Sequence, residues 1–392
     1  MNENNNLPAM LTGEELAAQE QAERYKELGP YLLDARANYP EPYYMLEYKG
    51  VPFSAIGGIQ ALSGQKKNGK TFVLAQLMAA ILSDGGPRAQ SYLSGLQVPE
   101  RTLEHLGHKP TVLYVDTEME KLNSAKVLRR VHWLCDWAMD VPNDRFHVLW
   151  LRGVTDAKND EGKTEERAYQ KRYRLIRLAI EMLHPDAVFI DGIRDIIGDF
   201  NDNAESAQLV GDLMALAEER QICIWNTLHM NPRPGNDDES KMRGHLGTEL
   251  GNKITDTLVS IKSKTAEGVT FTVKQNDARG KDMEDWKFAV TEAAGALGIP
   301  KIYGAPASTN ERPDTDDVEA IKAWIIEADS RFNWPMTRKE VKKLVFGDIG
   351  GQNNATIQQA DLQVAMNMHL LEESTVKKNG YYLLQPGQDL PF

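Results

Sequence analysis

The feature that most constrains this chain is the octapeptide Gly64–Thr71, which reads Gly-Gln-Lys-Lys-Asn-Gly-Lys-Thr. It follows a short apolar run, Ile59–Ser63, and precedes a stretch with helical periodicity, Lys70–Ile81. A glycine-rich turn between a strand and a helix directs backbone N–H groups and the positive end of the helix toward a phosphate. The sequence therefore predicts an α/β fold that is built around a P-loop.

The residue types of this loop predict a site for Mg-ATP. We expect Lys70 to reach the β- and γ-phosphates as a point charge, and the Thr71 hydroxyl to ligate Mg²⁺. The residues expected to contact the nucleotide are the loop and its successor: Gly64, Gln65, Lys66, Lys67, Asn68, Gly69, Lys70, Thr71 and Phe72.

Asp191 is the predicted second residue of the magnesium site. It closes Ala187–Asp191, a compact apolar run without alternation, as expected of a strand that is buried on both faces. An acid at the end of a strand beside the P-loop strand can hold Mg²⁺ and its water. The structural alternative is an ordinary acid at a strand end, before the turn at Gly192.

Strand and helix patterns alternate through most of the chain, which predicts a mainly parallel sheet with helices on both faces. Three later strands joined by short turns predict an antiparallel edge: Leu258–Ser263, Val269–Gln275 and Trp286–Thr291. Two polar segments, Asp156–Arg167 and Asn231–Gly244, are expected to be loops. The predicted organisation is an N-terminal helical extension over 1–49, an ATPase domain over 50–294, a linker over 295–314 and a C-terminal domain over 315–392.

The C-terminal segment has the pattern of a small winged-helix-like domain. Helical patterns precede a hairpin signal at Asn379-Gly380: Val318–Ala328, Thr337–Leu344 and Ala355–Met368. The third of these helices lacks Arg and Lys, and the nearest basic pair on the wing is Lys377 and Lys378. The domain could therefore bind DNA or serve as a docking module for another protein.

Composition restricts the possible partners. The net charge of −12 over 392 residues excludes a broad basic surface of the kind that coats nucleic acid, so any such contact must use a local basic lining. Two cysteines, Cys135 and Cys223, and the lack of an apolar run of about 20 residues favour a cytoplasmic protein that does not bind membranes.

The segment Asp116-Thr-Glu-Met-Glu120, which follows the predicted strand Thr111–Val115, resembles the RecA-like ATPases. These include the replicative DnaB-type and the plasmid RepA-type ring helicases. The resemblance implies that Glu118 is the catalytic glutamate, with Asp116 and Glu120 as alternatives. A solvated acidic turn is the structural alternative.

Later motifs extend this resemblance. In these families a polar sensor of the γ-phosphate follows the next strand, and His229 is at that place. Val273–Gly280 resembles the segment that supplies a lysine and an arginine to the neighbouring subunit's site, which implies this role for Lys274 and Arg279. Arg243 is a rival for the arginine, in a glycine-rich segment that resembles a DNA-facing loop. Solvated arginines are the structural alternative.

The resemblance implies a hexameric ring that acts as a DNA helicase or translocase in plasmid or mobile-element replication or mobilisation. Single-stranded DNA would then contact Lys241 and Arg243 in the channel. The C-terminal domain would bind DNA or a replication or mobilisation protein. Two other classes stay open, namely an ATP-switched scaffold and a phosphotransferase that acts on a small molecule.

Overall fold

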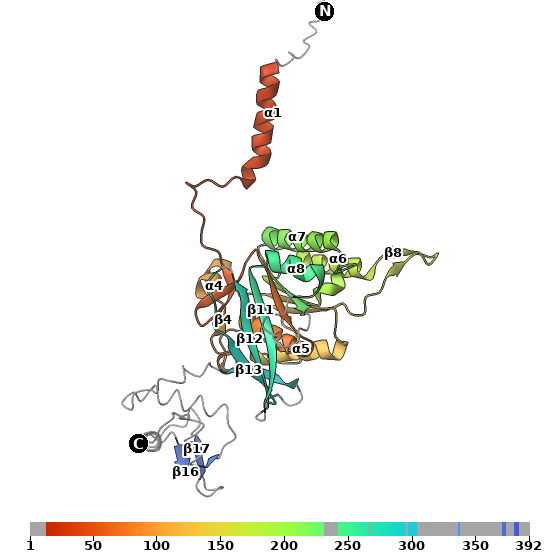
Figure 1. Cartoon of the computed structure of the whole chain (residues 1–392). Coiled ribbons are helices and arrows are strands. Elements are labelled where there is room, and N and C mark those ends of the chain that lie inside the picture. Colours follow the sequence, from red (N-terminus) through yellow and green to blue (C-terminus); the bar gives the residue numbers. More distant parts are fainter. Residues whose placement is uncertain are drawn as a thin grey trace, which may run out of the picture. The chain divides into compact units, whose positions relative to one another are not determined.

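The computed structural model describes residues 13–230, 242–265, 268–278, 280–294 and 297–303, and the backbone of short strands over 336–337, 371–373 and 380–383. The chain divides into two compact units, 1–42 and 43–392. In the first unit, helix α1 (Gly13–Leu28) continues into the 3₁₀ turn η1 (Gly29–Tyr31) and an extended segment (Figure 1). Every side chain described between residues 19 and 42 is exposed, so this segment has no core of its own.

The second unit is built on a nine-stranded sheet in the order β14-β13-β12-β11-β3-β10-β9-β5-β6. From β11 to β6 all neighbouring strands are parallel, whereas β12, β13 and β14 continue the sheet as an antiparallel extension. The strands are β3 (Ile59–Gly64), β5 (Val112–Asp116), β6 (Phe146–Trp150), β9 (Ala187–Asp191), β10 (Cys223–His229), β11 (Asp256–Thr265), β12 (Gly268–Ala278), β13 (Trp286–Thr291) and β14 (Ile299–Tyr303). The predicted α/β class with a mostly parallel central sheet is confirmed.

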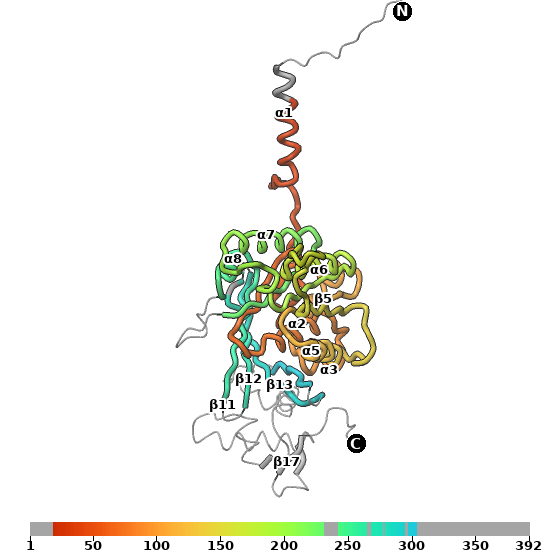
Figure 2. The backbone as a smooth tube through the Cα atoms, turned by 90° about the vertical axis from the view of Figure 1, so that its right-hand side faces the viewer, coloured from red at the N-terminus to blue at the C-terminus, as the bar shows by residue number. Residues whose placement is uncertain are grey.

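Helices cover both faces of this sheet (Figure 2). One apolar core joins one face of the sheet to α2 (Lys70–Leu82), α3 (Pro87–Tyr92), α4 (Glu100–Leu106), α5 (Lys121–Leu134) and a small sheet of β1 (Tyr44–Tyr48), β2 (Val51–Ala55) and β4 (Leu96–Gln97). A second core joins the other face to α6 (Ala168–Leu183), α7 (Asn203–Arg220) and α8 (Gly244–Lys253). Strands buried on both faces explain the apolar runs without alternation in the sequence.

Two segments predicted as loops contain regular structure. Within Asp156–Arg167, β7 (Ala157–Lys158) and β8 (Thr164–Glu166) pair as an antiparallel ribbon, whose polar residues suit a ribbon that packs no core. Helix α8 covers most of the glycine-rich motif that resembled a DNA-facing loop. Leu246 and Leu250 are both buried one helical turn apart, and this packing makes the motif helical despite its glycines.

The sheet also extends past the end predicted for the ATPase domain. Strand β14 lies inside the predicted linker and pairs with β13, and its residues Ile299 and Ile302 are buried. At the other end, β1 begins at Tyr44, inside the predicted N-terminal extension.

In the C-terminal segment the structure describes β15 (Met336–Thr337), β16 (Leu371–Glu373) and β17 (Gly380–Leu383), which form an antiparallel sheet in the order β15-β17-β16. Gly380 is part of β17 and pairs with Thr337, and Asn379 of the expected turn lies outside the described residues. Apart from Thr337, which belongs to β15, the predicted helices lie outside the described residues, and the winged-helix-like domain stays a prediction.

Both cysteines lie inside the cores. Cys135 and Cys223 are free thiols, 6% and 0% exposed. Burial raises the pKa of both thiols, to about 12 for Cys223. Neither thiol is therefore in the exposed, electropositive setting that makes a cysteine reactive.

Candidate nucleotide-binding site

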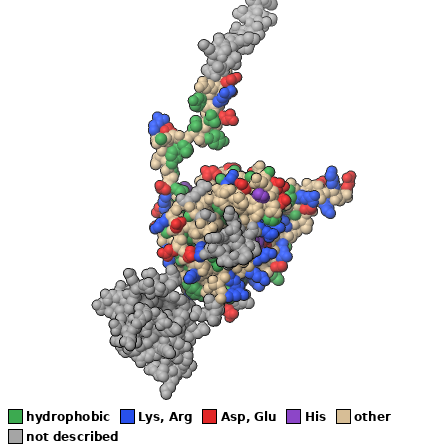
Figure 3. Space-filling view, in the orientation of Figure 1, with side chains coloured by type: hydrophobic (Ala, Val, Ile, Leu, Met, Phe, Trp, Pro, Cys, Tyr) green, Lys and Arg blue, Asp and Glu red, His purple; other side chains and the backbone are tan. Residues whose placement is uncertain are grey.

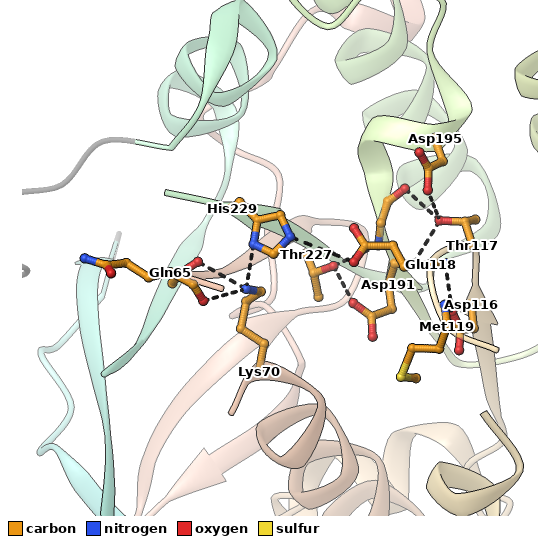
Figure 4. A network of polar contacts seen from close by, with 12 residues as sticks. Gln65, Lys70, Asp116, Thr117, Glu118, Met119, Asp191, Asp195, Thr227 and His229 are labelled. Carbon is orange, nitrogen blue, oxygen red and sulfur yellow. Dashed lines mark hydrogen bonds and ion pairs between the residues drawn. The ribbon is translucent and has the colours of Figure 1, made fainter. Parts of the chain in front are cut away.

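Four strand ends meet at one edge of the parallel sheet. The register pairs His229 with Gly64 across β10 and β3, and Asp191 with Asp116 across β9 and β5. Because these strands are parallel and adjacent, the loops after them are adjacent as well (Figure 4). The carboxyl edge of such a sheet is where ligands of α/β proteins bind.

The backbone of the P-loop adopts left-handed conformations, which glycine permits. Gly64, Lys67 and Gly69 have positive φ angles of 153°, 65° and 82°. A Cβ atom on Gly64 would lie 2.7 Å from the Ser260 carbonyl oxygen, and one on Gly69 would lie 2.6 Å from the Phe271 ring. The loop therefore packs directly against β11 and β12, and side chains at its two glycines would displace it.

Lys70 projects from the start of α2 into the loop and is only 9% exposed. Its Nζ lies 3.1 Å from the Gly64 carbonyl oxygen, 3.2 Å from that of Gln65 and 3.0 Å from His229 Nδ1 (Figure 4). Burial lowers the pKa of Lys70, and the nearby charges of Asp191 and Glu118 oppose this shift. Within the described part of the chain the ammonium has no carboxylate at ion-pair distance, so it lacks an anionic partner.

Asp191 ends β9 and is 5% exposed. Its Oδ1 accepts a hydrogen bond of 2.7 Å from the Thr227 hydroxyl, and its Oδ2 one of 3.0 Å from the Tyr114 hydroxyl. Burial raises the pKa of Asp191, and these two hydrogen bonds reduce the shift. The carboxyl group is thus fixed in direction, with lone pairs left for a cation or its water.

Glu118 follows β5 and extends over the end of β9. Burial and the charges of Asp191 and Asp195 raise the pKa of Glu118 to about 7. Its path requires the glycine at 192, because a Cβ there would lie 2.8 Å from Glu118 Cγ and 2.3 Å from Thr117 Oγ1. A carboxyl group with a pKa near 7 exchanges protons readily at neutral pH, as a general base must.

His229 stands between the lysine and the glutamate. Its Nδ1 lies 3.0 Å from Lys70 Nζ, and its Nε2 lies 3.9 Å from Glu118 Oε2. Burial, with the positive charge of Lys70 as a second cause, lowers the pKa of His229 to about 4. The ring is therefore neutral at pH 7, and because Lys70 donates to Nδ1, its proton belongs on Nε2, toward Glu118.

The two alternative acids have other partners. Asp116 is fully buried and accepts hydrogen bonds from the backbone N–H groups of Glu118 and Met119 and from the Ser124 hydroxyl. Glu120 is exposed and pairs with Arg152 at 2.6 Å, and this hydrogen bond lowers the pKa of Glu120 to about 2. Asp116 thus shapes the turn that carries Glu118.

The remaining predicted residues lie at different places. Arg243 precedes α8, with its guanidinium Cζ 5.7 Å from the Phe200 ring centre. Lys274 lies on β12 opposite Val259 of β11. Phe72 packs in the core between the Arg130 guanidinium, at 4.4 Å, and the Phe271 ring, at 6.3 Å. Arg279 and Lys241 lie outside the described residues.

The loop residues differ in exposure. Lys66 and Lys67 are exposed, whereas Gln65, Asn68, Thr71 and Phe72 are half-buried. The Asn68 carbonyl oxygen accepts a hydrogen bond from the Ser260 hydroxyl, which ties the tip of the loop to β11.

Sequence reasoning missed the polar residues that hold the acids in place. They are Tyr114, Thr117, Asp195 and Thr227. The Thr117 hydroxyl lies 3.0 Å from the Asp191 carbonyl oxygen and 3.0 Å from Asp195 Oδ2, so it joins the turns after β5 and β9. Their signal was present, since a Tyr or Thr inside an apolar run needs a partner once it is buried.

The charges of this edge fit Mg-ATP. A buried ammonium without a carboxylate partner suits a phosphate. A buried, oriented carboxylate at the end of β9, two strands from the P-loop strand β3 and on the same edge, suits a divalent cation. The Thr71 hydroxyl and Asp191 are the residues that would hold the cation, and the P-loop with Lys70 would hold the phosphates.

A comparison with protein families agrees with this geometry. Residues 51–232 match the model of the AAA domain. This stretch includes the P-loop, Glu118, Asp191 and His229. A search of curated proteins found no match to the chain. In the part of the chain that the structure describes, no helix has the length and apolar character to cross a bilayer.

Proposed function

We propose that this chain binds Mg-ATP at Gly64–Thr71 and hydrolyses it. The observation that supports this most strongly is the buried Lys70 ammonium, which the P-loop carbonyl groups and His229 hold beside the two acids Glu118 and Asp191. A buried cation inside a glycine-rich loop is costly unless an anion pairs with it. The phosphates of a nucleotide supply that negative charge.

Each residue then has a separate task. Lys70 binds the β- and γ-phosphates, and Asp191 with Thr71 positions the cation. When bound, Mg²⁺ would shield the negative charges of the phosphates. Glu118 orients a water molecule and accepts its proton, for which a pKa of about 7 is suited. His229 links Lys70 to Glu118 and would therefore respond to a γ-phosphate that draws Lys70 away.

We also propose that the chain assembles into a ring. The resemblance to the ring helicases suggests six copies. The first unit exposes large apolar side chains that a monomer leaves in water (green in Figure 3): Tyr25 62%, Leu28 53%, Tyr31 81%, Leu32 59%, Leu33 83% and Tyr39 55%. Contact with another copy would bury them. In such a ring Lys274 and Arg279, or Arg243, would act on the neighbouring site.

We further propose that the ring moves on single-stranded DNA, as a helicase or translocase of plasmid or mobile-element replication or mobilisation. The resemblance of the motifs supports this, and the C-terminal domain is the proposed site for a replication or mobilisation protein. The test is ATP turnover of the wild type and of Lys70→Ala, each with and without single-stranded DNA. We expect turnover that DNA stimulates and that the variant loses.

Lys126→Ala is the matched control, because Lys126 is an exposed cation of α5 outside the site. It should retain most of the turnover that Lys70→Ala loses. Slow turnover that DNA leaves unchanged would contradict the motor and favour the ATP-switched scaffold. Equal turnover in the wild type and Lys70→Ala would contradict the ATP site itself.

A further inference from the structure

Two arginines share one aromatic ring beside the candidate site. The Arg194 guanidinium Cζ lies 4.2 Å from the centre of the Phe200 ring, and that of Arg243 lies 5.7 Å from it. Among the described residues neither guanidinium forms an ion pair or a hydrogen bond. We call Arg194, Phe200 and Arg243 the arginine–phenylalanine cluster.

The backbone holds this cluster in place from two sides. The Phe200 carbonyl oxygen accepts a hydrogen bond of 3.1 Å from Leu246 N–H of α8. Gly244, with a φ of 77°, leaves room for the ring, since a Cβ there would lie 2.6 Å from it. Arg194 belongs to the 3₁₀ turn η2 (Ile193–Ile196) directly after β9, next to Asp195, which Thr117 contacts. The cluster therefore joins the end of β9 to the start of α8.

The cluster faces the residues that surround Lys70. Arg194, Phe200 and Arg243 line a small cleft together with the acid and the imidazole of the site, and its full lining is Glu118, Arg194, Phe200, Thr227, Leu228, His229 and Arg243. The Arg194 charge contributes to the lowered pKa of His229, which places that charge near the ring.

Two guanidinium groups without carboxylate partners repel each other, and one aromatic ring offsets only a part of that repulsion. An anion between or beside them removes the rest. Phosphate oxygens accept paired hydrogen bonds from the planar guanidinium group, and these bonds are strong. The neighbouring P-loop implies which anion this is, namely the terminal phosphate of a nucleoside triphosphate.

We propose that Arg194 and Arg243, held on Phe200, bind the terminal phosphoryl group of the nucleotide in the same chain. The proposal rests on the ATP site proposed above. It assigns to Arg194 a role that the sequence did not suggest, and it places Arg243 in its own chain's site instead of a neighbour's. The two arginines then respond to the presence of the third phosphate.

The first test compares affinities for ADP and for a non-hydrolysable ATP analogue, measured with Mg²⁺ by calorimetry on the full chain. Arg194→Ala should weaken the analogue about tenfold or more, as expected for a lost charged hydrogen bond. ADP binding should change by less than about twofold, which also shows that the variant is folded. Arg129→Ala removes an exposed arginine of α5 and is the matched control.

Phe200→Leu separates positioning from charge, because it keeps an apolar side chain and removes the ring face. It should weaken the analogue about threefold and leave ADP unchanged, a smaller loss than that of Arg194→Ala. Equal losses for both nucleotides, or none in either variant, would overturn the proposal. The proposal would also be overturned if Arg194→Ala relieved the inhibition of turnover by inorganic phosphate but left binding of the analogue unchanged. The arginines would then bind only released phosphate.

Mixing two variants tests whether Arg194 acts in its own chain. In a mixture of Arg194→Ala and Lys70→Ala chains, an arginine that acts on the neighbour restores complete sites, whereas one that acts in its own chain restores none. We expect no recovery of turnover, and recovery would refute the assignment. If Lys70→Ala binds ATP as well as the wild type, the proposed function fails; if only Arg194→Ala matches the wild type, this inference alone fails.

Discussion

At the scale of single residues, the proposed role of Glu118 as general base depends on its protonation state. Its pKa of about 7 results from burial and from the nearby acids Asp191 and Asp195. A general base must be ionised, so we expect turnover to fall about tenfold per pH unit below this value and to level off above it. A pH profile of turnover at saturating ATP measures this.

Glu118→Gln should reduce turnover by about 100-fold or more while ATP still binds. The same substitution tests the pKa through stability. Because the folded pKa lies above the ordinary value of 4.5, the folded state binds the additional proton, so Glu118 lowers stability as pH rises from about 4.5 to about 7. The difference in free energy of unfolding between Glu118→Gln and the wild type should therefore shift in favour of the variant across this window. A constant difference would contradict the raised pKa.

A second prediction concerns the glycine under Glu118. Gly192 has a φ of 102°, and a Cβ there would meet Thr117 Oγ1 at 2.3 Å. Gly192→Ala should cost about 1–3 kcal/mol of stability and displace Glu118, so turnover should fall as well. Chemical denaturation and turnover together measure both effects.

Gly211→Ala is its matched control. Gly211 lies inside helix α7, and nothing lies within 4 Å of where its Cβ would be. The substitution should raise stability by about 0.5–1 kcal/mol, because alanine favours a helix interior. If both variants behaved alike, crowding at Gly192 would not be the cause.

At the scale of elements, the antiparallel extension supports the P-loop. Phe271 of β12 is 5% exposed, stacks on Phe288 of β13 at 4.8 Å and contacts Gly69. Phe271→Ala should cost about 3–5 kcal/mol and should weaken ATP binding, since the loop loses its support. Denaturation and calorimetry of the variant test this.

Val269→Ala provides the comparison on the same strand, because Val269 is 41% exposed. Its stability should stay within about 0.5 kcal/mol of the wild type. A small effect at Phe271 with intact ATP binding would mean that β12 does not support the loop.

The sequence predicted those elements whose burial is uniform. The runs at Ile59, Thr111 and Ala187 predicted β3, β5 and β9 to within a few residues, because strands buried on both faces carry continuous apolar residues. The ribbon β7–β8 and strand β14 were missed, since the former buries little and the latter depends on pairing with β13. Helix α8 was missed because its glycines indicate a loop, and its two buried leucines are too few to show helical periodicity in so short a segment.

For the site, chain order predicted the P-loop and the acids but not their supports. Tyr114, Thr227 and Asp191 come from three strands, and only the sheet order brings them together. The link from Lys70 through His229 to Glu118 likewise depends on β10 lying next to β3. Pairing over such separations is not encoded in any local pattern.

At the scale of the whole molecule, the N-terminal unit should matter for assembly and not for folding. Because the described side chains of residues 19–42 are all exposed, a chain that begins at Tyr43 should unfold within about 2 °C of the wild type. It should also bind ATP, yet form smaller assemblies in light scattering. Full-length Tyr31→Ser/Leu33→Ser should show the same loss of assembly, and an unchanged mass in both cases would contradict this.

The two inaccessible thiols make the molecule convenient for spectroscopy. Reagents such as maleimides react with thiolates that they can reach, and Cys135 and Cys223 offer neither exposure nor ionisation. A cysteine introduced at an exposed position, for example Gln208→Cys on α7, would accordingly accept a fluorophore without removal of the native ones. Energy transfer between dyes on separate copies could then count and time their association in the unaltered background.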